Sequence, residues 1–414
     1  MSEIKIFNDP VHGFLRIPRD IIFQLIEHPY FQRLRRIKQL GLTHMVYPGA
    51  LHTRFHHALG ALHLMQETIE TLKSKGVSIT EEESEAAGIA ILLHDIGHGP
   101  FSHTLEHELT TNITHEELSL IFMQKLNQEF DYRLTTAIEI FKGNYHKHFL
   151  HQLVSSQLDL DRMDYLRRDS FYTGVSEGVI GADRIIKMLN VVDGHLVVEA
   201  KGIHSIENFL IARRLMYWQV YLHKTVVAAE ELLIKIIQRA RELTKKGEKL
   251  FASPSLYYFL THPPDKKAFY DNSKVLDTFA RLDDYDVIGS IKVWASHEDP
   301  VFAQLCNSLI NRQLFKIEFS GQPFDEQKIQ KLKKQVSQYY SIKEQDAEYF
   351  VFCKSLENQT YSHEEARINI LFNDGTIQDI TQATDQYELS IKNSRLKKYF
   401  LCYPKALTEL NTIS

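Results

Sequence analysis

Hydrophobic residues recur at helical spacing over most of the first 245 residues of the chain. From Phe31 to about Leu243 they return every three or four positions, as at Phe55, Leu59 and Leu62, which is the period of an amphipathic helix. Residues before Phe31 instead combine turn signals with short apolar runs. Three stretches are predicted as helical blocks: residues 84–93, 153–166 and 206–243.

The pattern changes after residue 246. Prolines interrupt the helical stretches there, and two short apolar runs, 314–319 and 368–372, predict strands. The second run leads into the turn Asn373-Asp374-Gly375. We therefore predict a mainly α-helical protein, with a large helical domain at residues 1–245. A smaller C-terminal α+β region at residues 246–414 would serve packing or assembly.

Composition narrows the class of protein. Hydrophobic residues make up 43% and charged residues 24% of the chain, and no stretch approaches the roughly 18 apolar residues of a membrane span. The three cysteines are far apart and form no CxxC pair, so we expect a reducing cytoplasm and no thiolate zinc site. The net charge of −5 gives no overall footprint for nucleic acid, although a local basic groove could still hold a single strand.

A histidine and an aspartate follow directly on the apolar helix predicted at residues 84–93. Burying His94 and Asp95 side by side is costly unless both are satisfied, and a divalent cation satisfies both. The dipeptide alone is weak evidence, because helix-end capping explains most such pairs. Its context strengthens the metal hypothesis, since many of the 21 histidines lie between His52 and His151.

Other predicted helices supply further ligand candidates. His57 lies upstream in one helix, and Asp161 lies downstream in a segment where acids alternate with apolar residues. Two histidines and two aspartates from three helices would form a mixed nitrogen and oxygen site. Spacing alone does not decide which histidines and acids are ligands. For Asp159 and Asp164, solvation or helix ion pairing explains the residue equally well.

The order of these residues along the chain resembles that of the HD-domain superfamily. Within it, the chain more closely resembles the deoxynucleoside triphosphate triphosphohydrolase (dNTPase) family. It resembles a bacterial-type relative that lacks the sterile alpha motif of the animal enzyme. The resemblance covers roughly residues 5–235. It is carried by these segments: NDPVHG at 8–13, FQRLRRIKQLG at 31–41, YPGA at 47–50, HTRF at 52–55, HDIGHGPFSH at 94–103, and 159–169.

The resemblance implies an HD-domain helical core, a metal site and a reaction. The implied ligands are His57, His94, Asp95 and Asp161, holding a divalent cation that could be Mg, Mn, Fe, Ni or Zn. The family converts a dNTP and water to a deoxynucleoside and triphosphate. A cation of this kind polarises a phosphoryl oxygen and lowers the pKa of a bound water. No departure from the family pattern removes a ligand, although His56 stands where the family has glutamate.

The resemblance also implies the residues around the reacting phosphate and the nucleoside. His103 matches the position of the general acid, and His98, Glu106 and His115 match polar groups beside the α-phosphate. The implied substrate-binding residues are Gln39, Leu40, Arg54, Arg162, Tyr165, Asp169, Arg213, Tyr217 and Tyr221. Several of them lie on two predicted helical stripes: Tyr165 shares one with the metal ligand Asp161 and with Arg168 or Asp169, and Arg213, Tyr217 and Tyr221 form the other.

Regulation is a further expectation from the family. Asn8, Gln32 and Arg35 match parts of a regulatory nucleotide site in the animal enzyme, and Glu27 replaces its guanine-contacting acid. Allosteric activation by a nucleotide and a homo-oligomer, either dimer or tetramer, would follow. Two other functions stay open: a phosphatase or phosphodiesterase acting on another nucleotide, and a nucleotide- or nucleic-acid-binding regulator with little turnover.

Overall fold

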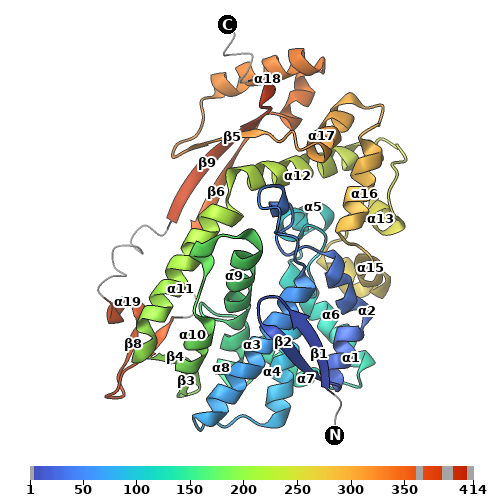
Figure 1. The fold of residues 1–414 in the computed structure, drawn as a ribbon. Helices are drawn as coiled ribbons and strands as arrows, with labels where there is room; N and C mark the ends of the chain where they lie inside the picture. Colours follow the sequence, from blue (N-terminus) through green and yellow to red (C-terminus); the bar gives the residue numbers. More distant parts are fainter. Residues whose placement is uncertain (1–3, 360–366, 385–394, 408–414) are drawn as a thin grey trace.

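The computed structural model describes residues 4–359, 367–384 and 395–407. The predicted mainly helical fold is confirmed, with small sheets at its periphery (Figure 1). The long helix α12 (Lys224–Lys245) lies between the helices of the N-terminal part and the strands and helices of the C-terminal part. Its residues contact α5 (Glu106–Leu109) on the N-terminal side, and α13 (Pro254–Thr261) and α17 (Pro300–Ile310) on the C-terminal side.

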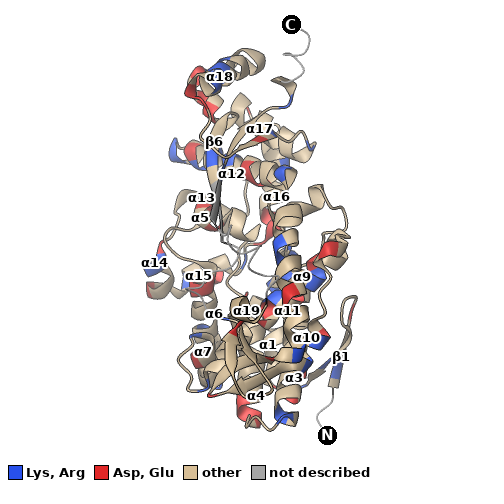
Figure 2. Cartoon of the chain, turned by 90° about the vertical axis from the view of Figure 1, so that its left-hand side faces the viewer, with Lys and Arg blue, Asp and Glu red and all other residues tan. Residues whose placement is uncertain are grey.

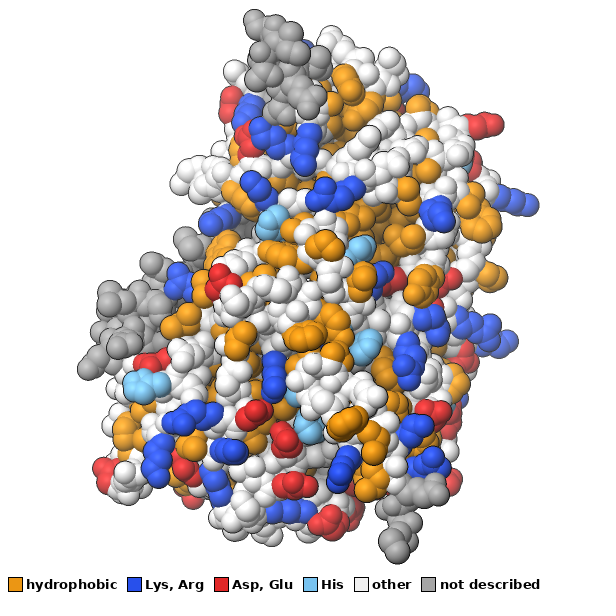
Figure 3. Space-filling view, viewed as in Figure 1, with side chains coloured by type: hydrophobic (Ala, Val, Ile, Leu, Met, Phe, Trp, Pro, Cys, Tyr) orange, Lys and Arg blue, Asp and Glu red, His pale blue; other side chains and the backbone are white. Residues whose placement is uncertain are grey.

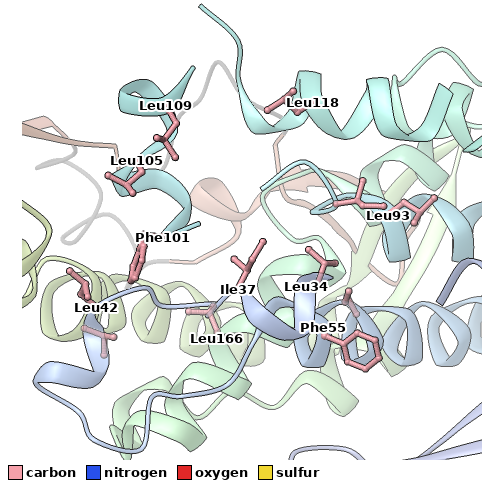
Figure 4. Close-up of a cluster of buried hydrophobic side chains, with 14 of the residues drawn as sticks. Leu34, Ile37, Leu42, Phe55, Leu93, Phe101, Leu105, Leu109, Leu118 and Leu166 are labelled. Carbon is pink, nitrogen blue, oxygen red and sulfur yellow. The ribbon is translucent and has the colours of Figure 1, made fainter. Parts of the chain in front are cut away.

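Three helices form the centre of the N-terminal part. α3 (Arg54–Ser74) packs against α4 (Glu81–Leu93) and against α9 (Leu160–Thr173). The predicted helix at 84–93 begins three residues earlier, because Thr80 and Glu83 cap each other's backbone N–H groups. Part of the buried core around these helices is drawn in Figure 4, where the labelled side chains include Leu34, Phe55, Leu93, Leu118 and Leu166.

Two predicted helical blocks are interrupted, so those predictions were wrong in detail. The block at 153–166 breaks between α8 (His148–Val154) and α9, because the Asp159 carboxylate accepts from the backbone N–H of Arg162 and starts a new helix. The block at 206–243 divides into α11 (Ile203–Met216), a π-helical turn (Tyr217–Tyr221) and α12. Helix capping and the wider π turn depend on local hydrogen bonds, and the spacing of hydrophobic residues does not predict such bonds.

The remaining helices surround this centre. On the N-terminal side they are α1 (Ile21–Glu27), α2 (Pro29–Gln32), α5 (Glu106–Leu109), α6 (His115–Glu129), α7 (Thr135–Phe141) and α10 (Ala182–Met188). Towards the C-terminus they are α14 (Lys266–Asp271), α15 (Ser273–Phe279), α16 (Asp284–Trp294), α18 (Glu326–Tyr340) and α19 (Ile380–Ala383).

The strands in the described residues form three small sheets. β1 (Ile4–Asp9) and β2 (Gly13–Pro18) form an antiparallel hairpin near the N-terminus. The second sheet has the order β3 (Leu189–Val192), β4 (His195–Glu199), β7 (Asn369–Leu371) and β8 (Ile377–Asp379). The third has the order β5 (Lys316–Ser320), β9 (Arg395–Tyr403) and β6 (Phe352–Gln359).

These sheets confirm the two strand predictions and add two hairpins that were not predicted. The runs at 314–319 and 368–372 correspond to β5 and β7. The hairpins β1–β2 and β3–β4 lie in segments predicted as turns or helix. β4 pairs in parallel with β7, so one sheet joins strands from both sides of residue 246.

The surface carries both signs of charge. Blue segments (Lys and Arg) and red segments (Asp and Glu) occur near one another on several helices in Figure 2, and the face drawn in Figure 3 mixes both signs with hydrophobic side chains. That face therefore presents no continuous basic stripe of the kind that binds a nucleic-acid backbone. Within the described ranges, no helix combines the length and the apolar character that a membrane crossing requires.

The packing of α3 on α9 depends on a glycine. A Cβ atom added to Gly60 would lie 2.0 Å from the Asp164 Oδ1 and 2.2 Å from the Arg168 Nη2. We predict that Gly60→Ala lowers the free energy of unfolding by roughly 1–3 kcal/mol through overpacking, although alanine is the better helix former.

Gly289 in α16 provides the matched control, because its added Cβ would meet no heavy atom within 4 Å. Gly289→Ala should raise stability by roughly 0.5–1 kcal/mol. Both changes are measured by urea unfolding. An equal gain in the two variants would contradict the close approach of α9 to Gly60.

Candidate metal centre and substrate cavity

His57 and His94 present one ring nitrogen each towards Asp161. The His57 Nε2 lies 3.0 Å from the Asp161 Oδ1 and 3.4 Å from the His94 Nε2. The Nδ1 atoms of both rings have other partners, 2.8 Å away at the Asp164 carboxylate and 2.6 Å away at the Ile91 carbonyl. Since each Nδ1–H donates to an oxygen, the Nε2 atom is the one that each ring directs towards a cation beside Asp161.

Asp95 completes this cluster. Its Oδ1 lies 3.4 Å from the His94 Nε2, and its Oδ2 lies 3.8 Å from the His57 Nε2 and accepts a hydrogen bond from Arg54. The structure thus brings together all four predicted ligands, from α3, the end of α4, and α9. Two imidazoles and two carboxylates suit a divalent cation of the first transition row, and also Mg²⁺ or Mn²⁺. The Asp161 side chain is 28% exposed, so the site is open on one side, as catalytic metal sites are.

The charges within the cluster shift the pKa values of its members in opposite directions. Burial lowers the pKa of His57, but hydrogen bonds to Asp161 and Asp164 outweigh burial and raise it to about 10. Burial raises the pKa of Asp161, while hydrogen bonds from His57 and His94 lower it to well below its usual range. When no cation is bound, the protonated ring of His57 therefore donates to the carboxylates of both Asp161 and Asp164.

A buried carboxylate behind the cluster orients His57. Asp164 Oδ2 contacts the His57 Nδ1, while its Oδ1 lies 2.7 Å from the His12 Nε2. Arg168 donates to both oxygens at 2.9 Å and also donates to Asp9 at 2.7 Å. The sequence left the role of Asp164 open and predicted no role for His12, Arg168 or Asp9. The position of Asp164 three residues after Asp161, one turn along the same helix, was the only available signal.

Arg33 fixes the loop that carries the HD pair. Its Nη2 donates to the carbonyl oxygens of Ile96 and His98, both at 2.7 Å. The guanidinium lies 5.3 Å from the ring centroids of both Phe122 and Phe279. Burial lowers the pKa of Arg33 to about 9. This arginine lies in the segment that carried the family resemblance, but the sequence did not predict a role for it.

A cavity of about 590 Å³ opens beside the metal cluster. Most residues predicted for catalysis and substrate binding line it: Gln39, Leu40, Arg54, His98, His103, His115, Arg162, Tyr165, Asp169, Arg213, Tyr217 and Tyr221. Asp95 and Asp161 reach it from the cluster. Thr43, Thr104, Leu222 and Glu230 also line it and were not predicted.

The predicted catalytic histidines gather around Glu106. The helix ends before His98, so that residue does not share a helical face with His94; its ring instead stacks on His115, with centroids 3.9 Å apart. Glu106 accepts from the backbone N–H of His115 at 2.6 Å and lies 3.5 Å from the His103 Nδ1. Burial raises the pKa of Glu106, but the bonds to His103 and His115 lower it to well below its usual range. Glu106 is therefore an anion that orients both rings from behind the cavity wall.

The arginines and tyrosines of the cavity are held by neighbouring side chains. Arg213 donates to Gln157 at 2.7 Å, and Arg162 donates to the Asp159 carboxylate. The Tyr221 hydroxyl donates to Asp169 at 2.8 Å. The rings of Tyr165 and Tyr217 each lie edge-on to Tyr221, with centroids 6.2 Å apart. The two predicted helical stripes therefore meet on the cavity wall.

The residues predicted for a regulatory site lie elsewhere. Arg35 donates to Gln32 at 2.8 Å and its guanidinium lies 3.6 Å from the centroid of Phe55. Glu27 is close enough for its charge to raise the pKa of Arg35 against the larger effect of burial. Asn8 lies in β1, opposite Phe14 of the hairpin. None of the four lines the cavity.

Comparison with known proteins gives the family. The HD domain family matches residues 54–169, and the HD associated region matches residues 180–252. The crystal structure of a phosphohydrolase from Bacteroides thetaiotaomicron is similar with a TM-score of 0.94 and 52% identity, covering 97% of this chain and 100% of that one. The chain belongs to the HD-domain phosphohydrolases.

Relatives of this HD-domain phosphohydrolase include the uncharacterized protein YwfO of Bacillus subtilis, which is 33% identical over 98% of this chain and 94% of its own length. A deoxynucleoside triphosphate triphosphohydrolase SAMHD1 homolog of Dictyostelium discoideum is 31% identical over 59% of this chain and 51% of its own length. The expected superfamily is confirmed, and the similarity to proteins named as dNTPases is confined to part of the chain.

The contact of Asp164 with His57 leads to a prediction about metal affinity. Asp164→Asn removes the charge that orients the imidazole, so we expect a roughly 10–100-fold loss of Mn²⁺ affinity by titration calorimetry. Circular dichroism at the assay temperature verifies that the variant is folded. Asp183→Asn, at an exposed aspartate paired with Arg167, is the control. Unchanged affinity in a folded Asp164→Asn protein would show that this carboxylate does not position the ligand.

The pKa of His57 leads to a second prediction. Because His57 keeps its proton up to about pH 10 without a cation, binding of the cation must displace that proton. Affinity should therefore rise with pH between 6 and 9, by roughly tenfold per unit for each proton displaced. Calorimetry in two buffers of different ionisation enthalpy counts the protons released. A metal affinity that does not change with pH is incompatible with these ligands.

Proposed function

We propose that this HD-domain phosphohydrolase is a metal-dependent dNTP triphosphohydrolase, which converts a dNTP and water to a deoxynucleoside and inorganic triphosphate. One observation carries the proposal. A single cavity of about 590 Å³ is lined by carboxylates of the metal cluster, by three arginines and by three tyrosines. It therefore offers a cation, anion-binding groups and aromatic surfaces to one ligand, which is the combination that a nucleoside triphosphate requires.

The phosphate end of the substrate would lie between the metal cluster and the arginines. A divalent cation bound by His57, His94, Asp95 and Asp161 would polarise a phosphoryl oxygen and activate a water molecule. Arg54, Arg162 and Arg213 would bind the non-bridging oxygens, because a guanidinium donates two parallel hydrogen bonds to phosphate. Each of these arginines is already oriented by a partner, Asp95, Asp159 or Gln157, so the donors need little rearrangement in the transition state.

The departing 5′ oxygen needs a proton. His103 would donate it, since its side chain lines the cavity and its Nδ1 lies 3.5 Å from the Glu106 carboxylate, which orients the ring. His98 and His115 stack beside it and would hold oxygens of the α-phosphate. Glu106 acts through both neighbouring rings and is a positioning residue.

The deoxyribose would rest on the tyrosine wall. Asp169 accepts from the Tyr221 hydroxyl at 2.8 Å and can also accept from a 3′-hydroxyl group. Tyr165 and Tyr217 flank Tyr221, and an aromatic ring beneath the sugar leaves no room for a 2′-hydroxyl group. Gln39 and Leu40 line the same cavity and would contact the base. The Dictyostelium relative, named as a dNTP triphosphohydrolase, supports the same substrate class.

Product analysis tests the proposal. The protein is incubated with each dNTP and each ribonucleoside triphosphate in the presence of Mg²⁺ or Mn²⁺, and the products are separated by anion-exchange chromatography. We expect deoxynucleoside and intact triphosphate from dNTPs only. Release of orthophosphate or a nucleoside monophosphate would identify a phosphatase or phosphodiesterase, and binding without turnover would identify a regulator.

The metal cluster gives a prediction for this assay. Asp95→Ala removes a proposed ligand that is also the partner of Arg54, so we expect turnover to fall by at least about 10³-fold, in the upper part of the usual range for loss of a single catalytic group. Asp183→Ala, at the exposed aspartate, should keep the wild-type rate. Wild-type turnover in Asp95→Ala would disprove the assignment of the site.

A further inference from the structure

Glu230 is an acid in the cavity wall that has no role in the proposed chemistry. Glu230 lies on α12 and lines the cavity together with Leu40, Thr43 and Leu222. Its side chain is mostly buried, and the Thr104 hydroxyl lies within hydrogen-bonding reach of its carboxyl group. The motifs of the sequence did not include it.

Glu230 differs from the other acids of the cavity because it has no cationic partner. Asp95 accepts from Arg54, and Asp161 contacts the imidazole of His57. No lysine, arginine or histidine in the described part of the chain lies within ion-pair distance of Glu230. Burial, followed by the charge of the neighbouring Glu231, raises the pKa of Glu230 to about 7, against the bond from Thr104. A buried carboxyl group in this state gains most from a ligand that donates hydrogen bonds to it.

The charge of the substrate limits which part of it can lie against Glu230. A carboxylate repels a polyphosphate chain, so this acid and the triphosphate must occupy different parts of the cavity. The three arginines proposed to bind the phosphates donate hydrogen bonds to Asp95, Asp159 and Gln157, and none of them to Glu230. Asp169 and Tyr221 are proposed to bind the sugar. The group that remains for Glu230 is an N–H edge of the base.

We propose that Glu230 binds the base of the substrate and selects guanine, whose N1–H and N2–H groups lie side by side. The proposal rests on the proposed dNTP triphosphohydrolase function. Two N–H donors on a base stabilise the ionised form of Glu230, and the two acceptor oxygens of that carboxylate form a fork that matches two adjacent N–H groups. Adenine and cytosine place an acceptor nitrogen beside their amino group, and thymine places carbonyl oxygens on both sides of its N–H. Each of these bases would therefore set an acceptor against one carboxylate oxygen.

The effect of Glu230→Gln on base preference tests this role. Glutamine keeps the shape but turns an N–H₂ donor towards the donors of guanine. We expect kcat/KM for dGTP relative to dTTP to fall by roughly 10–100-fold, the usual effect of a bidentate base contact. The rate for dTTP should stay within about threefold of wild type. Mn²⁺ content, measured by elemental analysis, should not change, because Glu230 is not a ligand.

Glu231→Gln is the matched control. This neighbouring acid on the same helix accepts from Lys354 at 2.8 Å and does not line the cavity, so the base preference should persist. Thr104→Val, which removes the hydroxyl beside Glu230, is a second variant in case Glu230→Gln does not fold. It should reduce the preference for dGTP in the same direction.

A binding measurement separates this inference from the proposed function. Calorimetric titration with deoxyguanosine and with thymidine needs no turnover, and wild type should bind deoxyguanosine more tightly, with the difference lost in Glu230→Gln. If wild type releases no triphosphate yet shows this difference, the proposed function fails and the role of Glu230 stands. A wild type without guanine preference, or an equal loss for all bases in Glu230→Gln, overturns the role of Glu230.

Discussion

The buried carboxylate of Asp164 is the contact on which the rest of the site depends. It is inaccessible to solvent and contacts three basic side chains: His57, His12 and Arg168. Removing one partner from a buried ion pair costs about 3–5 kcal/mol, because it leaves an uncompensated charge in the interior. The carboxylate therefore fixes α9 against α3 at Gly60, orients the imidazole of His57, and through Arg168 and Asp9 holds the N-terminal hairpin against the helices.

The same contact explains how a helical domain can hold a cation near an open cavity. His57 and Asp161 face each other only because α3 and α9 approach closely, and His94 joins them because α4 ends there. The loop after His94 does not continue the helix, and Arg33 holds its carbonyl groups. His98 is thereby placed beside His115 at the cavity wall, so one buried layer positions both the proposed metal ligands and the histidines of the cavity.

Electrostatic pairing also divides the cavity into chemically different regions. Asp95 is paired with Arg54, Asp169 with His52 and Tyr221, and Glu106 with His103 and His115. These acids are satisfied within the protein and serve to orient donors. Among the described residues, Glu230 has no cationic partner and is hydrogen-bonded by the Thr104 hydroxyl, so the role proposed for it relies on hydrogen bonds donated by the ligand. Such a group contributes to selectivity more than to catalytic rate.

The sequence by itself determined the helical fold, the strands at β5 and β7, and a metal hypothesis at His94 and Asp95, because helical periodicity and residue chemistry are local properties of the chain. Resemblance to a family selected His57 and Asp161. Only the tertiary structure decided that Asp164 orients His57 and that Glu230 lines the cavity. It also showed that β4 pairs with β7 across the predicted boundary. These relations join residues more than a hundred positions apart, and they depend on close packing and buried charge, which no local pattern records.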